Sequence, residues 1–213
     1  MKKIFLIAAA VIGLFSTGFA QFTYGPKMGV NMSKFSGDRL MPGFQAGAFL
    51  NGEFYDRIGV QADFLWTIKG SRHVAVDSIT TITTSTVTGL PIPSTTTVNV
   101  ISTKYYRFID VPICVYFPIS EHIRGFVGPQ ISVFRHGTQT VTAGSSPLVR
   151  SDITGLKGKT SLCIGFDFKF NSPIVVGVRF VGNKFTGGSG GTADAKGQTL
   201  NSFMVNVGYR MNW

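Results

Sequence analysis

Eight stretches of this sequence alternate apolar and polar residues with a period of two, and this pattern constrains the fold more than any other feature. In the clearest stretch every even position from Ile58 to Ile68 is apolar, while Gln61 and Asp63 lie at odd positions. Successive side chains of a β-strand point to opposite faces, so such a stretch predicts a strand with one apolar and one polar face. The stretches cover residues 22–33, 44–54, 57–69, 104–117, 122–134, 161–170, 174–183 and 202–213.

The lengths of these strands and of the links between them predict a membrane barrel. Strands of about 10–14 residues can cross a bilayer at a tilt, whereas soluble strands have about half that length. Outer-membrane barrels have short periplasmic turns and longer extracellular loops. Short links at 55–56, 118–121 and 171–172 alternate here with long links at 34–42, 70–103, 135–156 and 184–199. The sequence therefore predicts an all-β fold, an eight-stranded antiparallel up-and-down transmembrane β-barrel with short periplasmic turns and long extracellular loops.

The longest of these links has a distinctive composition. Residues 78–97 consist mostly of Thr and Ser, and such a segment cannot bury a hydrophobic core. We expect it to lie outside the membrane, either as a mobile loop or as an extended strand tip.

The first 20 residues have the pattern of a signal peptide. Lys2 and Lys3 precede a short apolar run that ends at Phe15, and Gly18 and Ala20 place small residues where a signal peptidase cleaves. No later apolar run is long enough for a transmembrane helix. We therefore expect export, cleavage near Ala20, and a barrel domain over residues 21–213 in the outer membrane of a bacterial cell.

The formal net charge of +10 raises the question of an acidic partner. Export argues against nucleic acid as that partner. Many Lys and Arg residues fall in the predicted outer links, where outer-membrane lipid and the phosphates of lipopolysaccharide are candidate neighbours. Simple solvation of these side chains is the alternative.

Charged residues of both signs lie on the polar faces of the strands and would point into the lumen of a closed barrel. A lone buried charge costs several kcal/mol, so these side chains should pair. An eight-stranded interior is just wide enough for side chains to fill it. This geometry favours a plugged interior with a structural network of ion pairs over a narrow channel for small solutes. The residues are Lys27, Glu53, Asp63, Asp110, Arg124, Asp167, Lys169, Arg179 and Arg210.

Two cysteines, Cys114 and Cys163, also lie on polar faces. The periplasm is oxidising, but these residues lie at different distances from the predicted periplasmic turns. Cysteines whose Cα atoms are more than about 7 Å apart cannot be bridged. We expect two reduced cysteines in the lumen. The sequence has no CxxC pair and no cluster with metal-ligand spacing, so no metal or other cofactor is predicted.

Two histidines at predicted outer strand ends raise the alternative of a lipid-modifying barrel enzyme. Such chemistry pairs a His with a Ser or an acid, and His73 and His136 have Ser71, Ser132 and Asp77 nearby in the sequence. Because Ser is common in these links, solvated histidines are the simpler interpretation, and we expect no catalytic residues. Catalysis would require His73 or His136 to meet a Ser or an acid within hydrogen-bond reach.

The last predicted strand ends on an aromatic residue. Its apolar face includes Tyr209, Met211 and Trp213, and we interpret these residues as the signal read by the barrel-insertion machinery. Trp213 would then lie at the periplasmic rim.

Several motifs along the chain resemble the PorT-like family of small outer-membrane β-barrel proteins of Bacteroidetes. The resemblance rests on residues 25–33 with 35–38, on 42–47, on 107–113 and on 128–130. It implies an eight-stranded barrel in the outer membrane, and it suggests a link to secretion because the founding member is linked to a protease-exporting secretion system. The motifs are structural, so no functional residues follow from them. We expect a non-enzymatic scaffold whose outer links meet lipopolysaccharide or an unidentified protein partner.

Overall fold

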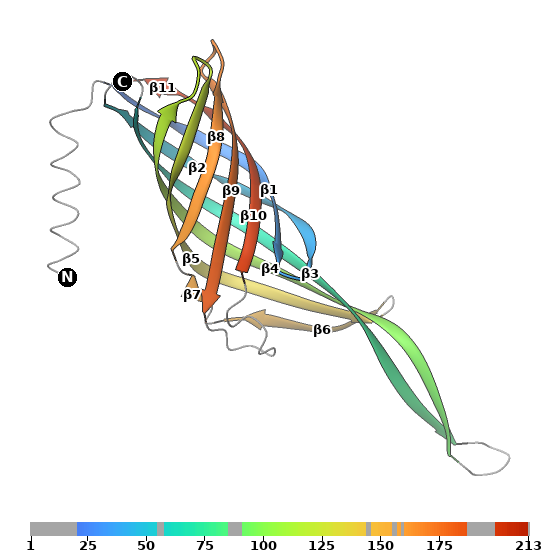
Figure 1. The fold of residues 1–213 in the computed structure, drawn as a ribbon. Helices are drawn as coiled ribbons and strands as arrows, with labels where there is room; N and C mark the ends of the chain where they lie inside the picture. Colours follow the sequence, from blue (N-terminus) through green and yellow to red (C-terminus); the bar gives the residue numbers. More distant parts are fainter. Residues whose placement is uncertain are drawn as a thin grey trace, which may run out of the picture.

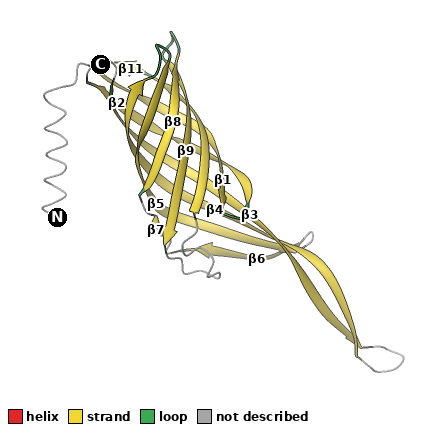
Figure 2. Ribbon diagram, in the orientation of Figure 1, coloured by secondary structure: helices red, strands yellow, loops and turns green. Residues whose placement is uncertain are grey.

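A computed structural model describes residues 21–54, 58–84, 91–143, 146–154, 157–158, 160–186 and 199–212. These residues form strands joined by turns (Figure 2). Among them, no helix is long and apolar enough to span a membrane.

Eight long strands form a closed wall (Figure 1). Each pairs antiparallel with the next, and the last returns to the first through registers that run from Lys27↔Gly208 to Phe35↔Leu200. The predicted up-and-down barrel is therefore confirmed. The wall strands are β1 (Gln21–Phe35), β2 (Arg39–Glu53), β3 (Gly59–Thr84), β4 (Pro91–Pro118), β5 (Ile123–Ala143), β8 (Ser161–Lys169), β9 (Ile174–Thr186) and β10 (Thr199–Tyr209). Three short strands flank the wall, namely β6 (Ser146–Ile153) beside β5, β7 (Lys157–Gly158) beside β9 and β11 (Met211–Asn212) beside β1.

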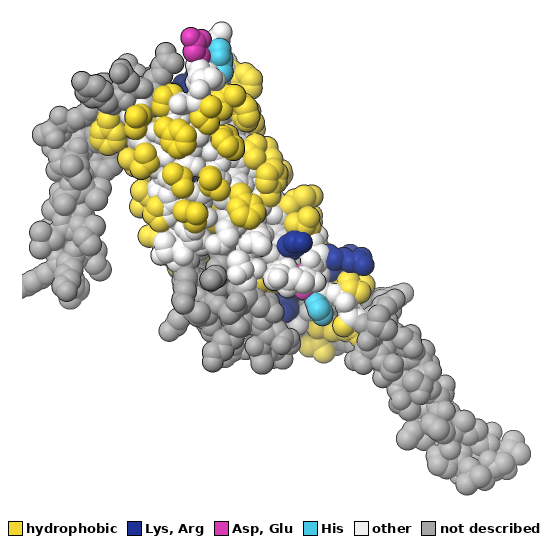
Figure 3. Space-filling model, viewed as in Figure 1, with side chains coloured by type: hydrophobic (Ala, Val, Ile, Leu, Met, Phe, Trp, Pro, Cys, Tyr) yellow, Lys and Arg dark blue, Asp and Glu magenta, His cyan; other side chains and the backbone are white. Residues whose placement is uncertain are grey.

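The apolar faces of the wall strands point outward. Phe64 and Leu162 are more than half exposed, and many other large apolar side chains join them in a broad belt (Figure 3). A soluble monomer seldom exposes so large an apolar surface. The belt is the surface that a barrel presents to lipid tails.

At one end of the barrel, strands continue well beyond the wall. β3 has 26 residues and β4 has 28, and they stay paired as far as Thr84↔Pro91, forming a twisted ribbon (Figure 1). The link predicted at 70–103 is thus largely an extended strand tip. Most of the link at 135–156 is likewise strand, because β5 continues to Ala143 and pairs with β6. β-Branched residues favour this conformation. The end that carries the ribbon is the outer end, and β11 lies at the opposite, inner end (Figure 1).

The prediction of a long link at 34–42 is wrong. β1 ends at Phe35 and β2 begins at Arg39, so a tight turn joins them, closed by a hydrogen bond from Asp38 N to Phe35 O. Gly37 makes this turn possible with a φ of 90°. Pro42 lies within β2, where a register shift between Met41 and Gln45 accommodates it.

The short turns at the inner end match the prediction where the structure describes them. β4 ends at Pro118, and hydrogen bonds from Ile119 N and Ser120 N to Ile123 O close the turn into β5. β8 ends at Lys169 and β9 begins at Ile174. The turn predicted at 55–56 lies outside the described residues.

Two apolar clusters lie inside the barrel, on the faces that are otherwise polar. The outer cluster closes the lumen near the ribbon and contains Phe35, Tyr106, Phe108, Ile153 and Leu200. The middle cluster contains Cys114, Tyr116, Phe126, Cys163, Val181 and Met204. The interior is therefore packed with side chains rather than open along its length.

Candidate functional site

Asp63 lies at the centre of the polar interior. Its carboxylate accepts hydrogen bonds from Lys27 Nζ at 3.0 Å, from Arg179 Nη2 at 2.7 Å and from Gln61 Nε2 at 2.8 Å. These side chains are buried and come from β1, β3 and β9. One carboxylate thus ties together strands from different parts of the wall.

Further ion pairs extend this network along the lumen. Their nitrogen–oxygen distances are 2.7 Å for Lys69–Asp110, 3.3 Å for Arg124–Asp167 and 3.2 Å for Lys169–Glu53. Arg210, the remaining residue of the predicted network, donates instead to the carbonyl oxygen of Ser172. Lys69 was absent from the predicted set, although the alternation of residues 57–69 places it on the same face as Asp63.

Aromatic rings also contact the buried cations, a feature that the sequence interpretation missed. The guanidinium of Arg124 lies 4.5 Å from the centre of the Tyr116 ring, and that of Arg179 lies 5.0 Å from the Phe126 ring. Such contacts are favourable when they are removed from water. The sequence did contain a signal for these contacts, because the alternation places aromatic residues on the same strand faces as the charged residues.

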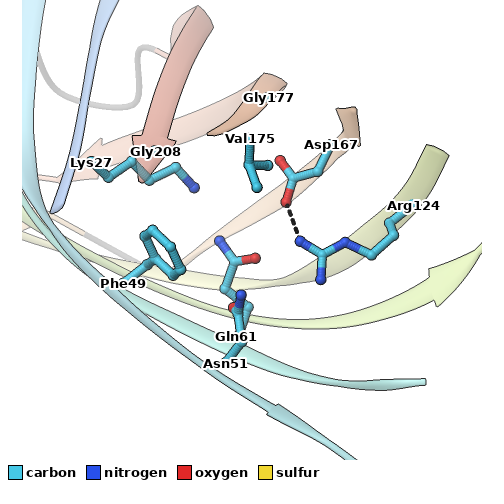
Figure 4. Close-up of a pocket in the computed structure, with 9 residues that line it drawn as sticks. All are labelled: Lys27, Phe49, Asn51, Gln61, Arg124, Asp167, Val175, Gly177 and Gly208. Carbon is cyan, nitrogen blue, oxygen red and sulfur yellow. Dashed lines mark hydrogen bonds and ion pairs between the residues drawn. The ribbon is translucent and has the colours of Figure 1, made fainter. Parts of the chain in front are cut away.

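The space left in this network is small. A cavity of about 10 Å³ lies among Lys27, Gln61, Arg124 and Asp167 (Figure 4). That volume accommodates about one water molecule. The arrangement can hold the strands together, but the cavity has no room for a solute.

Cys114 and Cys163 are free and buried in the middle cluster. They lie at different distances from the inner turns, and yet they lie at one level of the barrel. Gly128 pairs with Cys163 on β8, and its other side meets Cys114 on β4. Neighbouring strands of the barrel are staggered, and the turn between β8 and β9 lies farther from the two cysteines than the turn between β4 and β5 does. Cysteines at unequal distances from their own turns can therefore lie at one level.

At the outer end, His73 does meet an acid. Its Nδ1 lies 2.9 Å from Asp38 Oδ1, and the Ser71 hydroxyl donates to the other oxygen of the same carboxylate. The carboxylate thus lies between Ser71 and His73, whereas a catalytic triad needs the imidazole between the hydroxyl and the acid. His136 lies 3.8 Å from Asp152.

The other candidate catalytic residues do not complete such a group. Ser132 is buried in the lumen and accepts a hydrogen bond from Gln130. The side chain of Asp77 lies outside the described part of the structure. Within the described residues, no three His, Cys, Asp or Glu side chains converge as metal ligands would.

A group of cationic and aromatic side chains lies on the outer surface of β2–β5, just beyond the apolar belt. Arg39 and Arg72 are register partners, and Arg107 and His136 are partners on the next strand pair. These four residues and Tyr105, which pairs with Gly70 on β3, form the outer-rim patch. The register shifts by one residue at the β4–β5 pairing next to Arg107, and this shift brings His136 to the outer surface.

The outer-rim patch includes a groove of about 270 Å³. The groove is lined by Ile68, Tyr105, Arg107, His136 and Thr138. Figure 3 shows dark-blue Lys and Arg side chains where the yellow belt ends. The described side chains of this end include the cationic residues Lys34, Arg39, Arg72, Lys104, Arg107, Arg135 and Arg150, against the carboxylates of Asp38 and Asp152. The patch can therefore hold an anion next to an apolar surface.

The profile of a protein family described as "Outer membrane protein beta-barrel domain" matches residues 6–210, which is nearly the whole chain. The chain belongs to this family. The belt of this outer-membrane barrel is accordingly its lipid-facing surface, and the outer end faces away from the periplasm.

The solved structures that are similar to this chain include those of two bacterial proteins. One is Ail, the attachment invasion locus protein of Yersinia pestis, which was solved in complex with the heparin analogue sucrose octasulfate. Its sequence is 15% identical to this chain, the TM-score is 0.43, and the alignment covers 90% of this chain and 99% of Ail. Neisserial surface protein A (NspA) is 10% identical, with a TM-score of 0.45, over 89% of this chain and 97% of that one. No curated protein matches the chain by sequence.

The two ends of this outer-membrane barrel are described only in part. Tyr209 and Met211 point outward at the inner end, where they are 50% and 37% exposed. Trp213 and the predicted signal peptide, residues 1–20, lie outside the described residues.

Proposed function

We propose that this outer-membrane barrel is a non-enzymatic surface-binding protein whose outer-rim patch holds phosphate groups of lipopolysaccharide. The patch lies where the apolar belt ends, which is the level of lipid headgroups. The packed lumen supports a role on the outer wall rather than transport through the barrel.

The facing pair Arg39 and Arg72 carries this proposal. Like charges directly opposite each other on neighbouring strands are destabilising. Arg72 Nε is buried and has no hydrogen-bond partner among the described residues. A phosphate between the two guanidinium groups would remove the repulsion and accept hydrogen bonds, and the planar fork of Arg matches phosphate geometry.

The groove beside this pair favours a phosphate carried by a lipid. Ile68 and Tyr105 supply apolar surface next to Arg107 and His136, and Tyr105 is 41% exposed. An amphiphile can place its phosphate on the cations while an acyl chain runs down the belt. A soluble phosphorylated sugar would leave that apolar surface uncovered.

Replacing both Arg39 and Arg72 by Ala should weaken binding of lipopolysaccharide by about tenfold, because hydrogen bonds to charged groups contribute about 1.5–3 kcal/mol and part of this is screened at a surface. The measurement is the affinity of the refolded barrel for lipopolysaccharide micelles at two salt concentrations. The wild-type affinity should fall with salt.

Arg150→Ala is the matched control, because Arg150 is an exposed cation on β6 outside the patch. It should bind as the wild type does. Sucrose octasulfate, the ligand in the Ail complex, serves as a soluble polyanion for comparison. Equal binding by the double variant and the wild type, or binding indifferent to salt, would refute the proposal.

The non-enzymatic part of the proposal rests on the order of the groups around Asp38. Because this carboxylate lies between Ser71 and His73, the described contacts do not pair the hydroxyl with the imidazole as a Ser–His nucleophile requires. Mass spectra of lipid A from cells with the wild-type barrel and from cells with Ser71→Ala or His73→Ala should be identical. A change in acyl number that depends on either residue would establish an enzyme.

The proposal also includes a more specific family for this chain and its route of export. The motifs at 25–33, 42–47 and 107–113 support membership of the PorT-like barrels of Bacteroidetes, with the link to secretion that this implies. Lys2 to Ala20 support export and cleavage near Ala20. The outward positions of Tyr209 and Met211 support the proposal that the barrel-insertion machinery recognises these residues.

A further inference from the structure

Cys114, Gly128 and Cys163 form a row across β4, β5 and β8 inside the barrel. Gly128 has no side chain, and a Cβ at that position would lie 2.6 Å from the Cα of Cys114. The two cysteine side chains therefore lie next to each other above this glycine, close enough to interact. The pair lies within the middle cluster, with exposed fractions of 2% and 0%.

This spacing does not suit a disulfide. The two cysteines are separated by two strand spacings, about 9–10 Å, whereas a disulfide requires Cα atoms within about 7 Å and a sulfur–sulfur bond of about 2.05 Å. Two metal–sulfur bonds of about 2.3 Å would span about 4.6 Å in a linear arrangement. Two thiols that lie on either side of one strand therefore match a bridging metal ion better than a covalent bond.

The charges around the thiols favour a complex that carries one negative charge. Lys27 and Arg179 are both positive and share the single carboxylate of Asp63, which leaves a net charge of +1 on this buried group. Nε and Nη1 of Arg179 have no hydrogen-bond partner among the described residues, and Arg179 interacts electrostatically with both cysteines. Two thiolates on a monovalent metal ion carry a net charge of −1, whereas two thiolates on a divalent ion carry none.

The other groups of the cluster also favour a soft ion. Tyr116, Phe126, Val181 and Met204 belong to the same cluster as the thiols. Asp63, a carboxylate that acts on both thiols, is already paired with Lys27 and Arg179. Thiolate and thioether ligands select Cu(I) among biological metals. A tetrahedral zinc site would need more ligands than two cysteines.

We propose that Cys114 and Cys163 form a two-coordinate site for a soft monovalent metal ion such as Cu(I), inside the barrel and independent of the outer-rim patch. Binding forms two metal–sulfur bonds and releases two thiol protons to solvent, with no change in oxidation state. The resulting anion faces the unpaired nitrogens of Arg179.

Silver(I) is a suitable probe because it is soft, monovalent and stable in air. The barrel is refolded with and without Ag⁺ in chloride-free buffer, and its metal content is then measured. One ion per barrel is expected, and X-ray absorption should show two sulfur neighbours. Groups that only hydrogen-bond to metal ligands change metal affinity about 10–100-fold, so Cys114→Ser and Cys163→Ser, which remove a ligand, should each weaken binding at least about a hundredfold.

Met28→Leu is the matched control, because Met28 is a thioether on the lipid face, and its silver binding should equal that of the wild type. Folding of each variant is checked by heat-modifiable gel migration. If the serine variants do not fold, the X-ray absorption spectrum of the wild type still decides. Oxygen or nitrogen neighbours around silver, or full binding by a folded serine variant, would overturn the proposal.

Discussion

Asp63→Asn is expected to lower the free energy of unfolding of the barrel by about 3–5 kcal/mol, because it leaves buried cations without their counter-charge. Lys27 and Arg179 both depend on this carboxylate, with nitrogen–oxygen distances of 3.0 and 2.7 Å. All three side chains are at least nine-tenths buried. Burial therefore leaves little water to solvate the unpaired charges.

Urea unfolding of the barrel in lipid vesicles measures this loss. Lys27→Met is the informative partner variant, because it leaves the Asp63–Arg179 pair intact and should cost much less. The double variant Asp63→Asn with Lys27→Met leaves one uncompensated cation instead of two. It should therefore be more stable than Asp63→Asn alone. An Asp63→Asn barrel as stable as the wild type would show that the central carboxylate does not hold the lumen together.

Phe64→Arg is expected to destabilise the barrel in a bilayer by about 2–4 kcal/mol, the cost of a basic residue near the middle of the lipid face of a barrel. Phe64 lies within the apolar run of β3 between Ile58 and Ile68, and it is 61% exposed. The guanidinium would face lipid tails with no partner.

Phe64→Leu is the control, since it keeps the side chain apolar and should cost far less. Both variants are compared by urea unfolding in the same vesicles. If Phe64→Arg were as stable as Phe64→Leu, the belt around Phe64 would not face lipid, and the orientation of the whole wall would be wrong.

Much of the wall could be predicted because a period of two assigns every strand residue to one face. The alternation around Asp63 correctly placed Phe64 and Trp66 outside and Gln61 inside. The ends of the strands were harder to predict. The Thr-rich residues of β3 and β4 have the composition of a loop, yet the backbone ladder continues as far as Thr84, and β-branched residues favour strands.

The pairing of the interior charges could not be read from the sequence. Lys27 and Asp63 lie 36 residues apart, and Asp63 and Arg179 lie 116 apart. Which of them meet depends on the stagger of the strands around the barrel. The same stagger places Cys114 and Cys163 at one level although their distances from the turns differ.

The outer-rim patch could not be predicted from the sequence, because it depends on two irregularities of the strands that the alternation of apolar and polar residues does not show. The register shift at the β4–β5 pairing brings His136 to the outer wall beside Arg107. The tight turn after Phe35 shifts the start of β2, so that Arg39 faces Arg72. The sequence indicated basic residues in this region but not which of them would lie together.

Planar bilayer recordings test most directly whether the lumen is filled and the function lies on the outer wall. The purified barrel, shown to be folded by heat-modifiable gel migration, is added to a bilayer that contains lipopolysaccharide. Because ion pairs and two apolar clusters fill the interior, we expect no conductance steps. Stable, repeated steps from the folded wild-type protein would contradict a filled lumen and would favour a channel.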